Sequence, residues 1–351
     1  MIVLTFALLS ILGSVIASKQ EDFYGPGFFY VELPGQTYFG RLEDVLLGRQ
    51  TGRVCRIQLD GHQRREIYIF KDESEIPDSV AVDEGLGRIY FTSGRKQANN
   101  TWEGKIQQIN TDGTDLRTII TTNSLPTALK LVEHPNKKML YWVEGTEGLE
   151  GQAGHLIKRF NVNNRTEIET VIDTKRYACS IGVNATACPP VQDMAIDTRN
   201  MDIYWTQSLR WTLIPGSLHK LSLSMKPEET ATNRSGVQML LKDERHAKRI
   251  QYVDGSIYWV TESNSETQGS WIKRLGVEDW GKKDPEVVAQ VPKEQGYQII
   301  DAFAVDARQE TIWAMIGFTF SHFHKADLKG GGGFKLLRQW MAVSRSLVRV
   351  G

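Results

Sequence analysis

The chain is poor in cysteine and has no excess of either charge. Only three of its 351 residues are cysteines, too few for a small scaffold held together by disulfides. Lysine plus arginine and aspartate plus glutamate both number 42, so the formal net charge is zero. A balanced charge gives no general attraction to nucleic acid or to an anionic membrane, and we expect neither as a partner.

The sequence also lacks the short motifs of several enzyme classes. It contains no G-x-S-x-G nucleophile elbow, no phosphate-binding loop and no H-E-x-x-H motif. The glycine run at 330–333 precedes no phosphate-binding helix and predicts a hairpin loop. His322 and His324 would share one face of a strand, but no third histidine or cysteine lies near them in sequence to complete a zinc site.

Long apolar runs are absent except at the N-terminus. Residues 2–17 are almost all apolar or small, and Val15 and Ala17 supply the small residues of a cleavage site. The run has the length of a signal-peptide core and is short for a membrane span. We predict a signal peptide over residues 1–17, with an uncleaved anchor as the alternative. The mature protein would then be secreted and would have no membrane span.

Sequons and cysteine positions agree with an extracellular protein. Four N-x-Ser/Thr sequons fall in predicted loops, where an attached glycan is solvated; their asparagines are Asn99, Asn164, Asn184 and Asn233. Cys179 and Cys188 flank a polar segment, and a disulfide between them would close a small loop and stabilise the fold by roughly 2–3 kcal/mol. Cys55 lies in an alternating strand pattern, which favours a buried thiol.

What the chain does contain is a repeated strand pattern. An aromatic or aromatic-apolar pair recurs at intervals of about 50 to 60 residues, led by Tyr38, Tyr90, Tyr141, Tyr204, Tyr258 and Trp313. In three copies the pair follows a strand that ends in an aspartate: Asp83, Asp197 and Asp306. A period of this length with several short strands predicts an all-β protein, a six-bladed β-propeller with four-stranded antiparallel blades.

A second recurring element supports six blades. A third strand with alternating apolar and polar residues follows each aromatic pair, as at 52–59 and 104–110. We assign residues 22–339 to the propeller, with 28–33 as its first inner strand, and residues 340–351 to a C-terminal tail. The basic residues near this end, Lys335, Arg338, Arg345 and Arg349, predict a solvated segment. How the ring closes is left open.

These motifs resemble a known repeat. Tyr90-Phe91-Thr92 and Tyr204-Trp205-Thr206, the preceding Val-Asp or Ile-Asp and the following Gly-Lys-Ile with Asp-Gly resemble the YWTD repeat of low-density-lipoprotein-receptor-like propellers. The resemblance spans about residues 28–338. The fourth motif position is Ser93, Glu144 or Gln207 instead of aspartate, and the accessory modules of those receptors are absent from this sequence. The resemblance implies a propeller that binds or packs against other proteins, and it carries over no catalytic residue.

Residues near the starts of the inner strands are expected to face the channel: Asp78, Gln192, Asp193, Lys248, Arg249 and Asp301. Three of them form a candidate metal site. Asp78, Gln192 and Asp301 each lie five residues before one of the aligned aspartates. Three oxygen-bearing side chains from alternate blades could surround a calcium ion at the mouth of the channel. Strand entries are also often polar and solvated, so the same residues fit a channel without a metal. The aligned aspartates themselves are expected to cap turns, each in its own blade.

Tryptophans outside the repeated pair are candidate binding residues: Trp102, Trp211, Trp271 and Trp280. They lie in or near loops, where aromatic side chains anchor a protein partner or stack on a sugar, or else shield the edges of blades. We therefore predict a secreted, N-glycosylated, monomeric binding module for an extracellular protein, without a cofactor. The alternatives are a calcium-dependent propeller hydrolase of the lactonase or esterase type and an extracellular glycan-binding protein. The sequence does not identify the ligand.

Overall fold

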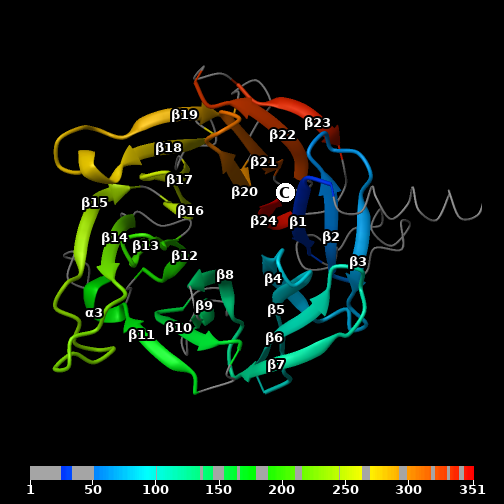
Figure 1. Cartoon of the computed structure of the whole chain (residues 1–351), viewed down its shortest axis with the longest axis horizontal. Helices are drawn as coiled ribbons and strands as arrows, with labels where there is room; N and C mark the ends of the chain where they lie inside the picture. Colours follow the sequence, from blue (N-terminus) through cyan, green and yellow to red (C-terminus); the bar gives the residue numbers. More distant parts are fainter. Residues whose placement is uncertain are drawn as a thin grey trace, which may run out of the picture.

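The chain folds into six four-stranded antiparallel sheets arranged around a central axis, which confirms the predicted six-bladed β-propeller (Figure 1). The structure is a computed structural model, and it describes residues 25–33, 51–99, 101–134, 137–144, 154–163, 167–178, 189–209, 216–244, 246–262, 269–291, 299–317, 321–329, 333–339 and 344–351. Besides the strands, the described segments contain one short α-helix, α3 (Lys175–Ala178), and one 3₁₀ turn, η3 (Val277–Asp279).

Five blades are built from consecutive strands, and in each the first strand lies nearest the axis. Blade 2 contains β4 (Ile76–Asp83), β5 (Arg88–Lys96), β6 (Trp102–Asn110) and β7 (Arg117–Thr122). Blade 3 contains β8 (Thr127–His134), β9 (Lys137–Glu144), β10 (Leu156–Asn161) and β11 (Glu169–Asp173). Blade 4 contains β12 (Val191–Asp197), β13 (Asp202–Gln207), β14 (Gly216–Ser222) and β15 (Gln238–Glu244). Blade 5 contains β16 (Lys248–Val253), β17 (Ser256–Glu262), β18 (Ser270–Gly276) and β19 (Glu286–Gln290). Blade 6 contains β20 (Ile299–Asp306), β21 (Thr311–Gly317), β22 (Ser321–Asp327) and β23 (Lys335–Gln339).

Blade 1 joins the two ends of the described chain and closes the ring. Its order is β24 (Ser344–Val350), β1 (Gly27–Glu32), β2 (Arg53–Gln58) and β3 (Arg65–Ile69). The segment 28–33 is therefore the second strand of its blade, and its assignment as an inner strand was wrong. It carries the aromatic pair of blade 1, and the inner position is taken by the C-terminal strand β24. The Tyr38 copy of the motif lies outside the described residues.

The predicted C-terminal tail is part of the propeller. β24 pairs antiparallel with β1 along its length, and it packs between β20 and β4 of the neighbouring blades. The expectation of a solvated basic end was also wrong for its arginines. Arg345 pairs with Asp78 at 3.0 Å and Arg349 pairs with Asp306 at 2.8 Å, so both bridge to adjacent blades.

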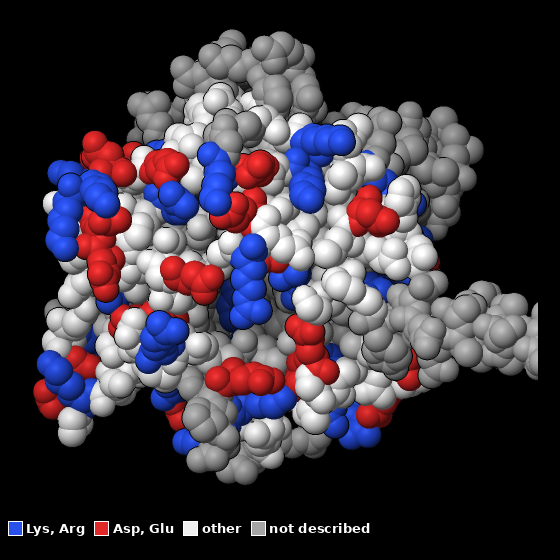
Figure 2. Space-filling view, turned by 45° about the horizontal axis from the view of Figure 1, so that its top comes forward, with Lys and Arg blue, Asp and Glu red and all other residues white. Residues whose placement is uncertain are grey.

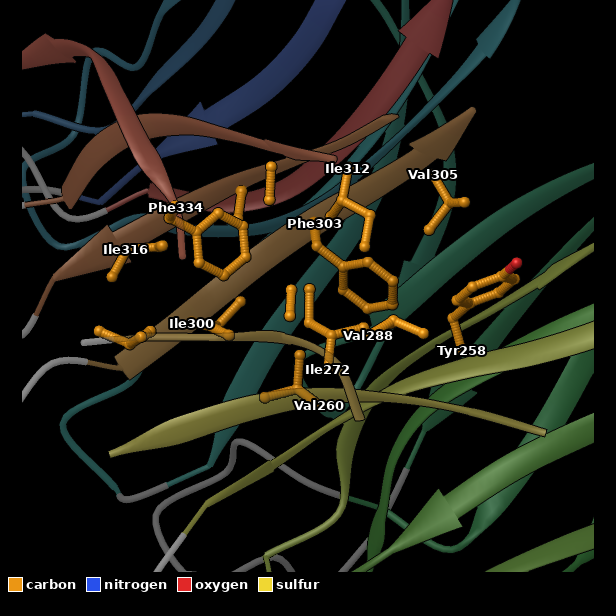
Figure 3. Close-up of a cluster of buried hydrophobic side chains, with 14 of the residues drawn as sticks. Tyr258, Val260, Ile272, Val288, Ile300, Phe303, Val305, Ile312, Ile316 and Phe334 are labelled. Carbon is orange, nitrogen blue, oxygen red and sulfur yellow. The ribbon is translucent and has the colours of Figure 1, made fainter. Parts of the chain in front are cut away.

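The hydrophobic core lies between neighbouring blades and is supplied by the repeated aromatic motif. The indoles of Trp142, Trp205, Trp259 and Trp313 are fully buried. A single blade cannot cover both of its faces, so each sheet buries its apolar residues against the next. Figure 3 shows one such layer, where Tyr258 and Ile272 of blade 5 meet Phe303 and Ile312 of blade 6.

The aspartates at the ends of three inner strands cap turns, as predicted. Asp83 accepts a hydrogen bond from the backbone N–H of Leu86, and Asp197 and Asp306 accept two backbone N–H groups each from the turns that follow them. Each also reaches the next blade. Lys138 donates to Asp83 at 2.7 Å, Arg349 pairs with Asp306, and Tyr252 hydrogen-bonds to Asp197. The capping residues therefore also connect blades.

The two faces of the propeller differ in their connections. We call the face at which the inner strands begin the entry face. Because the second strand runs antiparallel to the inner strand, as β5 does to β4, the loop between the second and third strands also lies at this face. Connections of this kind span residues 33–52, 145–155 and 263–269. At the opposite face most hairpins are short, such as 84–87 and 254–255, with 223–237 as a long exception. Loop-rich ends of a rigid scaffold commonly carry binding residues.

Candidate binding site at the entry face and channel

Every inner strand is interrupted by a β-bulge near its start. In each blade one residue on the second strand faces two residues on the inner strand. The six bulges lie between Pro77 and Val80, Thr127 and Lys130, Val191 and Asp193, Lys248 and Ile250, Ile300 and Ala302, and Arg345 and Leu347. Ala128, Arg249 and Ser346 have positive φ angles of 54°, 34° and 55°. A bulge redirects side chains, so these six bulges determine which side chains point into the channel near the entry face.

The three residues predicted to bind calcium lie at these bulges. Asp78, Gln192 and Asp301 are on the inner strands of blades 2, 4 and 6, so their shared position at the channel mouth follows the predicted register. Among the residues that the structure describes, no group of three histidines, cysteines, aspartates or glutamates is arranged to hold a metal ion. The calcium site stays a prediction, and the contacts of each residue indicate how its oxygens are used.

Asp78 binds both neighbouring blades. The residue is 3% exposed, and its carboxylate accepts hydrogen bonds from Arg345 at 3.0 Å, from the Ser79 hydroxyl at 2.8 Å and from the Ala128 backbone N–H at 3.3 Å. Burial alone would raise the pKa of Asp78, but the positive charges of Arg345 and Arg249 and these hydrogen bonds lower it. The carboxylate is thus ionised and connects blades 1, 2 and 3.

Asp193 has the same role two blades further along. Its carboxylate pairs with Lys130 of blade 3 at 3.1 Å and accepts the backbone N–H groups of Met194 at 2.8 Å and Ile250 of blade 5 at 3.1 Å. Sequence reasoning selected the adjacent Gln192, whose amide instead donates to the Ser208 carbonyl at 2.8 Å. Asp193 was expected to face the channel but was not assigned to the metal, because Gln192 is the residue five positions before Asp197. The bulge lies at the same place in β4, β12 and β20, so Gln192 keeps the strand position of Asp78 while Asp193, one residue further along, makes the contacts.

In blade 6 the contact is made through the backbone. The Nε of Arg249 donates to the carbonyl oxygen of Asp301 at 2.8 Å, and the Asp301 carboxylate lies 3.5 Å from the Ser321 hydroxyl. Arg249 lies on blade 5, so a basic residue of an odd-numbered blade again meets an aspartate of the following even-numbered blade. The basic residues are Arg345, Lys130 and Arg249, and the aspartates are Asp78, Asp193 and Asp301.

A cavity of about 280 Å³ lies on the axis and is lined by all six inner strands. Lys130, Asp193, Arg249 and Arg349 supply its charges, and Ser79 and Phe303 are among its other lining residues. Figure 2 shows lysine and arginine side chains at the edge of a hollow near the middle of the molecule, next to aspartate and glutamate side chains. The channel lining therefore combines charged groups, most of which are matched between blades, with apolar side chains such as Leu131, Val305 and Leu347.

The predicted tryptophans fall on both faces. Trp102 is the first residue of β6, and Trp271 is the second residue of β18. Both are third strands that begin at the entry face, and both tryptophans are half-buried. Trp211 lies between β13 and β14 in sequence, outside the described residues. Trp280 is 38% exposed at the opposite face, and its indole N–H donates to the Leu240 carbonyl of blade 4 at 2.7 Å. Trp280 thus contributes to contacts between blades.

The sequons and cysteines are only partly described. Asn99 and Asn233 are exposed in turns, whereas Asn164, Asn184, Cys179 and Cys188 lie outside the described residues. Cys55 is a buried free thiol, as expected, and burial raises its pKa. The Arg64 guanidinium lies 3.4 Å from its sulfur. The signal-peptide segment is also outside the described residues.

Comparisons with known proteins identify the fold and no family. The chain matches no protein-family profile and no curated protein. Among solved structures, TolB from Acinetobacter baumannii is similar with a TM-score of 0.58 and 10% identity, over 92% of this chain and 67% of the TolB chain. At this identity the likeness concerns the propeller fold alone. None of the helices in the described segments has the length and hydropathy of a bilayer-spanning helix.

Proposed function

We propose that this chain is a secreted, N-glycosylated, YWTD-type propeller that binds an extracellular protein at its entry face. The observation that carries the proposal is the difference between channel and rim. The channel carboxylates Asp78 and Asp193 accept hydrogen bonds from basic side chains and from backbone N–H groups of neighbouring blades. The rim of the same face carries long connections and the tryptophans Trp102 and Trp271.

A calcium-dependent hydrolase is the second candidate, because three oxygen-bearing residues lie at equivalent bulges. Its difficulty is chemical. A calcium ion requires six to eight oxygen ligands, and it would have to displace the Arg345 guanidinium from Asp78 and so break a largely buried ion pair. The binding role needs no such rearrangement and is therefore preferred.

Secretion is tested by expressing the full chain in a eukaryotic secretory cell line. We expect the protein in the medium, beginning after residue 17, with a mass that falls on treatment with an N-glycosidase. Retention inside the cell as an unprocessed, unglycosylated chain would contradict the proposed localisation.

Binding is tested with two matched surface variants. Partners captured by the immobilised propeller from extracellular medium are produced individually, and their affinity is measured by calorimetry. Trp271→Ala should weaken binding at least tenfold if the entry face is used, since buried aromatic anchors commonly contribute 2 kcal/mol or more. Leu86→Ala changes an exposed apolar residue in a hairpin of the opposite face and should leave affinity unchanged.

The result that contradicts this assignment is equal affinity for both variants and the parent protein. Hydrolysis of lactones or esters by the parent protein would instead support the hydrolase, if Asp78→Asn abolishes it and adding a protein partner does not restore it.

A further inference from the structure

We propose that the N-linked glycan of this chain at Asn99 folds back onto its own surface, with its first sugars seated against Trp102. This inference rests on the proposed secretion, because glycan transfer occurs in the secretory pathway. It adds a specific function for one sequon, and of the two rim tryptophans it assigns Trp102 to the glycan and leaves Trp271 for the entry-face partner.

Asn99 and Trp102 line the same surface hollow on blade 2. The hollow has a volume of about 480 Å³ and lies between the tip of the β5–β6 hairpin and the end of β7. Gln97, Thr101, Thr121 and Asn123 also line it. One aromatic side chain among amide and hydroxyl groups suits a sugar, which presents C–H groups on one side and hydroxyls at its edge.

Gly104 is the residue that allows this hollow to form. A Cβ at position 104 would lie 1.9 Å from the Ser124 carbonyl oxygen and 2.5 Å from the Thr122 hydroxyl. Only glycine therefore lets the segment after β7 cross so close to β6, two residues from Trp102. The other wall is fixed by a backbone hydrogen bond from Gln97 to Thr101 of 2.7 Å that closes the hairpin.

The side chain of Asn99 is arranged for modification. It is exposed, and its Oδ1 accepts hydrogen bonds from the Thr101 hydroxyl at 2.6 Å and the Thr101 backbone N–H at 3.1 Å. Both contacts use the oxygen, so the Nδ2 atom that receives the sugar has no partner among the described residues. In the transfer, the sugar C1 forms a bond to Nδ2, the bond from C1 to the phosphate of a lipid-diphosphate-linked oligosaccharide breaks, the amide loses one proton and the lipid diphosphate leaves.

The acidic group beside Trp102 is already paired, so the hollow suits a neutral ligand. Glu103 is the nearest acidic residue, and its carboxylate already accepts hydrogen bonds from Arg95 at 2.8 Å and Gln97 at 2.7 Å. Thr121 and Asn123 are exposed across the hollow and offer a hydroxyl and an amide to sugar hydroxyls.

The sequon at Asn233 is the natural control. Asn233 is also exposed in a turn, closed by its backbone N–H to the Thr230 carbonyl at 3.0 Å. The hydroxyl of its sequon residue, Ser235, donates to Glu229 instead of to the asparagine. A glycan at Asn233 therefore provides the same modification without the arrangement found at Asn99.

The test is a double-mutant cycle on the full chain secreted from glycosylating cells. Peptide mass mapping first measures the occupancy of Asn99 and Asn233. Melting temperatures are then compared for the parent, Trp102→Ala, Thr101→Ala and the double variant. We expect Trp102→Ala to lower the melting temperature by about 2 °C more when the Asn99 glycan is present than when Thr101→Ala has removed it, as the loss of one stacking contact predicts in a protein of this size.

Three controls separate the glycan from other effects of these substitutions. Thr101→Ser keeps the sequon and should retain both the glycan and the coupling. Trimming to a single sugar with an endoglycosidase should also retain it, because the first residue makes the contact. Asn233→Gln should leave the effect of Trp102→Ala unchanged.

Two results would overturn the inference without affecting the proposed secretion. One is an occupied Asn99 with no coupling to Trp102, and the other is an unoccupied Asn99 beside an occupied Asn233. If a soluble oligosaccharide quenches Trp102 fluorescence in Thr101→Ala, the hollow receives an external glycan, and the source proposed here is wrong. If neither sequon is occupied and the chain stays in the cell, the inference and the proposed function fail together.

Discussion

Blades 4 and 5 place the same buried tryptophan against different polar partners. In blade 5 the Trp259 indole N–H donates to Glu244 at 3.2 Å, and that carboxylate pairs with Lys273 at 2.9 Å. In blade 4 the Trp205 indole N–H donates to Gln207 at 3.2 Å, and the ring stacks on His219 with the centroids 5.2 Å apart. Glu244 ends β15 of blade 4, so the blade 5 tryptophan meets an ion pair shared by the two blades, whereas the blade 4 tryptophan meets neutral groups of its own blade.

The difference extends around the ring. Blades 3 and 1 also place an ion pair beside the motif aromatic, with Trp142, Glu144 and Lys158 in blade 3 and Tyr30, Glu32 and Arg64 in blade 1. In blade 1 the basic residue precedes β3, and Cys55 takes the third-strand position opposite Tyr30. The even-numbered blades 2 and 6 place Gln107 and His324 at the corresponding third-strand positions.

The same alternation governs the channel. Aspartates come from even-numbered blades and the basic residues that contact them come from odd-numbered blades. The unit that repeats is therefore a pair of blades, present three times. It follows that the charges at the channel mouth serve the contacts between the two kinds of blade.

The largest effect is expected from breaking the ionic arrangement of blade 1. Glu32 is 1% exposed and accepts hydrogen bonds from Arg64 at 2.7 and 3.0 Å and from Tyr30 at 3.2 Å. Glu32→Ala should lower the free energy of unfolding by about 4 kcal/mol, because the buried carboxylate that accepts from Arg64 and Tyr30 is lost, and the only other ion pair of Arg64 among the described residues is with Glu66. Urea denaturation measures it. Gln207→Ala in blade 4 should cost only about 1–2 kcal/mol, and equal losses in the two blades would remove the distinction between them.

Asp78→Asn tests the contact between the two kinds of blade in the channel. It keeps the size of the side chain and removes the charge that Arg345 and Arg249 stabilise. We expect a loss of about 2–3 kcal/mol in the urea-derived free energy of unfolding, and a similar loss for Asp193→Asn. Asp60→Asn, in an exposed turn, is the control. A loss no larger than that of the control would show that Asp78 does not hold blades together.

The neutral histidines of the even-numbered blades predict a pH dependence. Burial lowers the pKa of both His219 and His324 to about 4, below the ordinary value near 6.5. At pH values between about 4 and 6.5 these histidines bind more protons in the unfolded chain than in the folded chain. The free energy of unfolding therefore falls as the pH drops from about 7 towards 4.

His324→Leu isolates one of these groups. Both ring nitrogens of His324 are buried and have no hydrogen-bond partner among the residues that the structure describes. Leucine should therefore be tolerated at pH 7, and the variant should be about 1–2 kcal/mol more stable than the parent at pH 5. Urea titrations at the two pH values give the comparison. Parallel pH profiles for the two proteins would show that His324 does not contribute to acid sensitivity.

The smallest effect is expected at the outer edge between blades 4 and 5. Trp280→Phe removes the hydrogen bond from the indole N–H to the Leu240 carbonyl and keeps an aromatic ring. A loss of about 1 kcal/mol or less in thermal or urea unfolding is the expected result. A loss as large as that of Asp78→Asn would place the main contact between the blades at the rim.

Much of this fold follows from the sequence because the aromatic motif is local. Tyr204-Trp205-Thr206 and its copies fix both the period and the face that is buried, and the third strands confirm it. Ring closure could not be read in the same way. Strand β24 has no aromatic motif of its own, and its place beside β1 depends on a pairing between the two ends of the described chain.

The candidate site was predictable in position and less so in chemistry. The register located Asp78, Asp193 and Asp301 near the starts of the inner strands, but the count from the strand end selected Gln192 as a metal ligand although Asp193 is the residue that connects the blades. The partners of these aspartates are Arg345, Lys130 and Arg249, which come from other blades. No local pattern connects residues so far apart in sequence, and only the folded ring brings them together.

The most direct test of the central claim is the melting temperature of the secreted protein in excess EDTA and again after calcium is added. If the channel aspartates connect blades and leave ligand binding to the entry-face rim, the two values agree within about 1 °C, since no bound ion contributes to stability. A rise of several degrees with calcium that disappears in Asp78→Asn would contradict the account and would assign the channel to a metal.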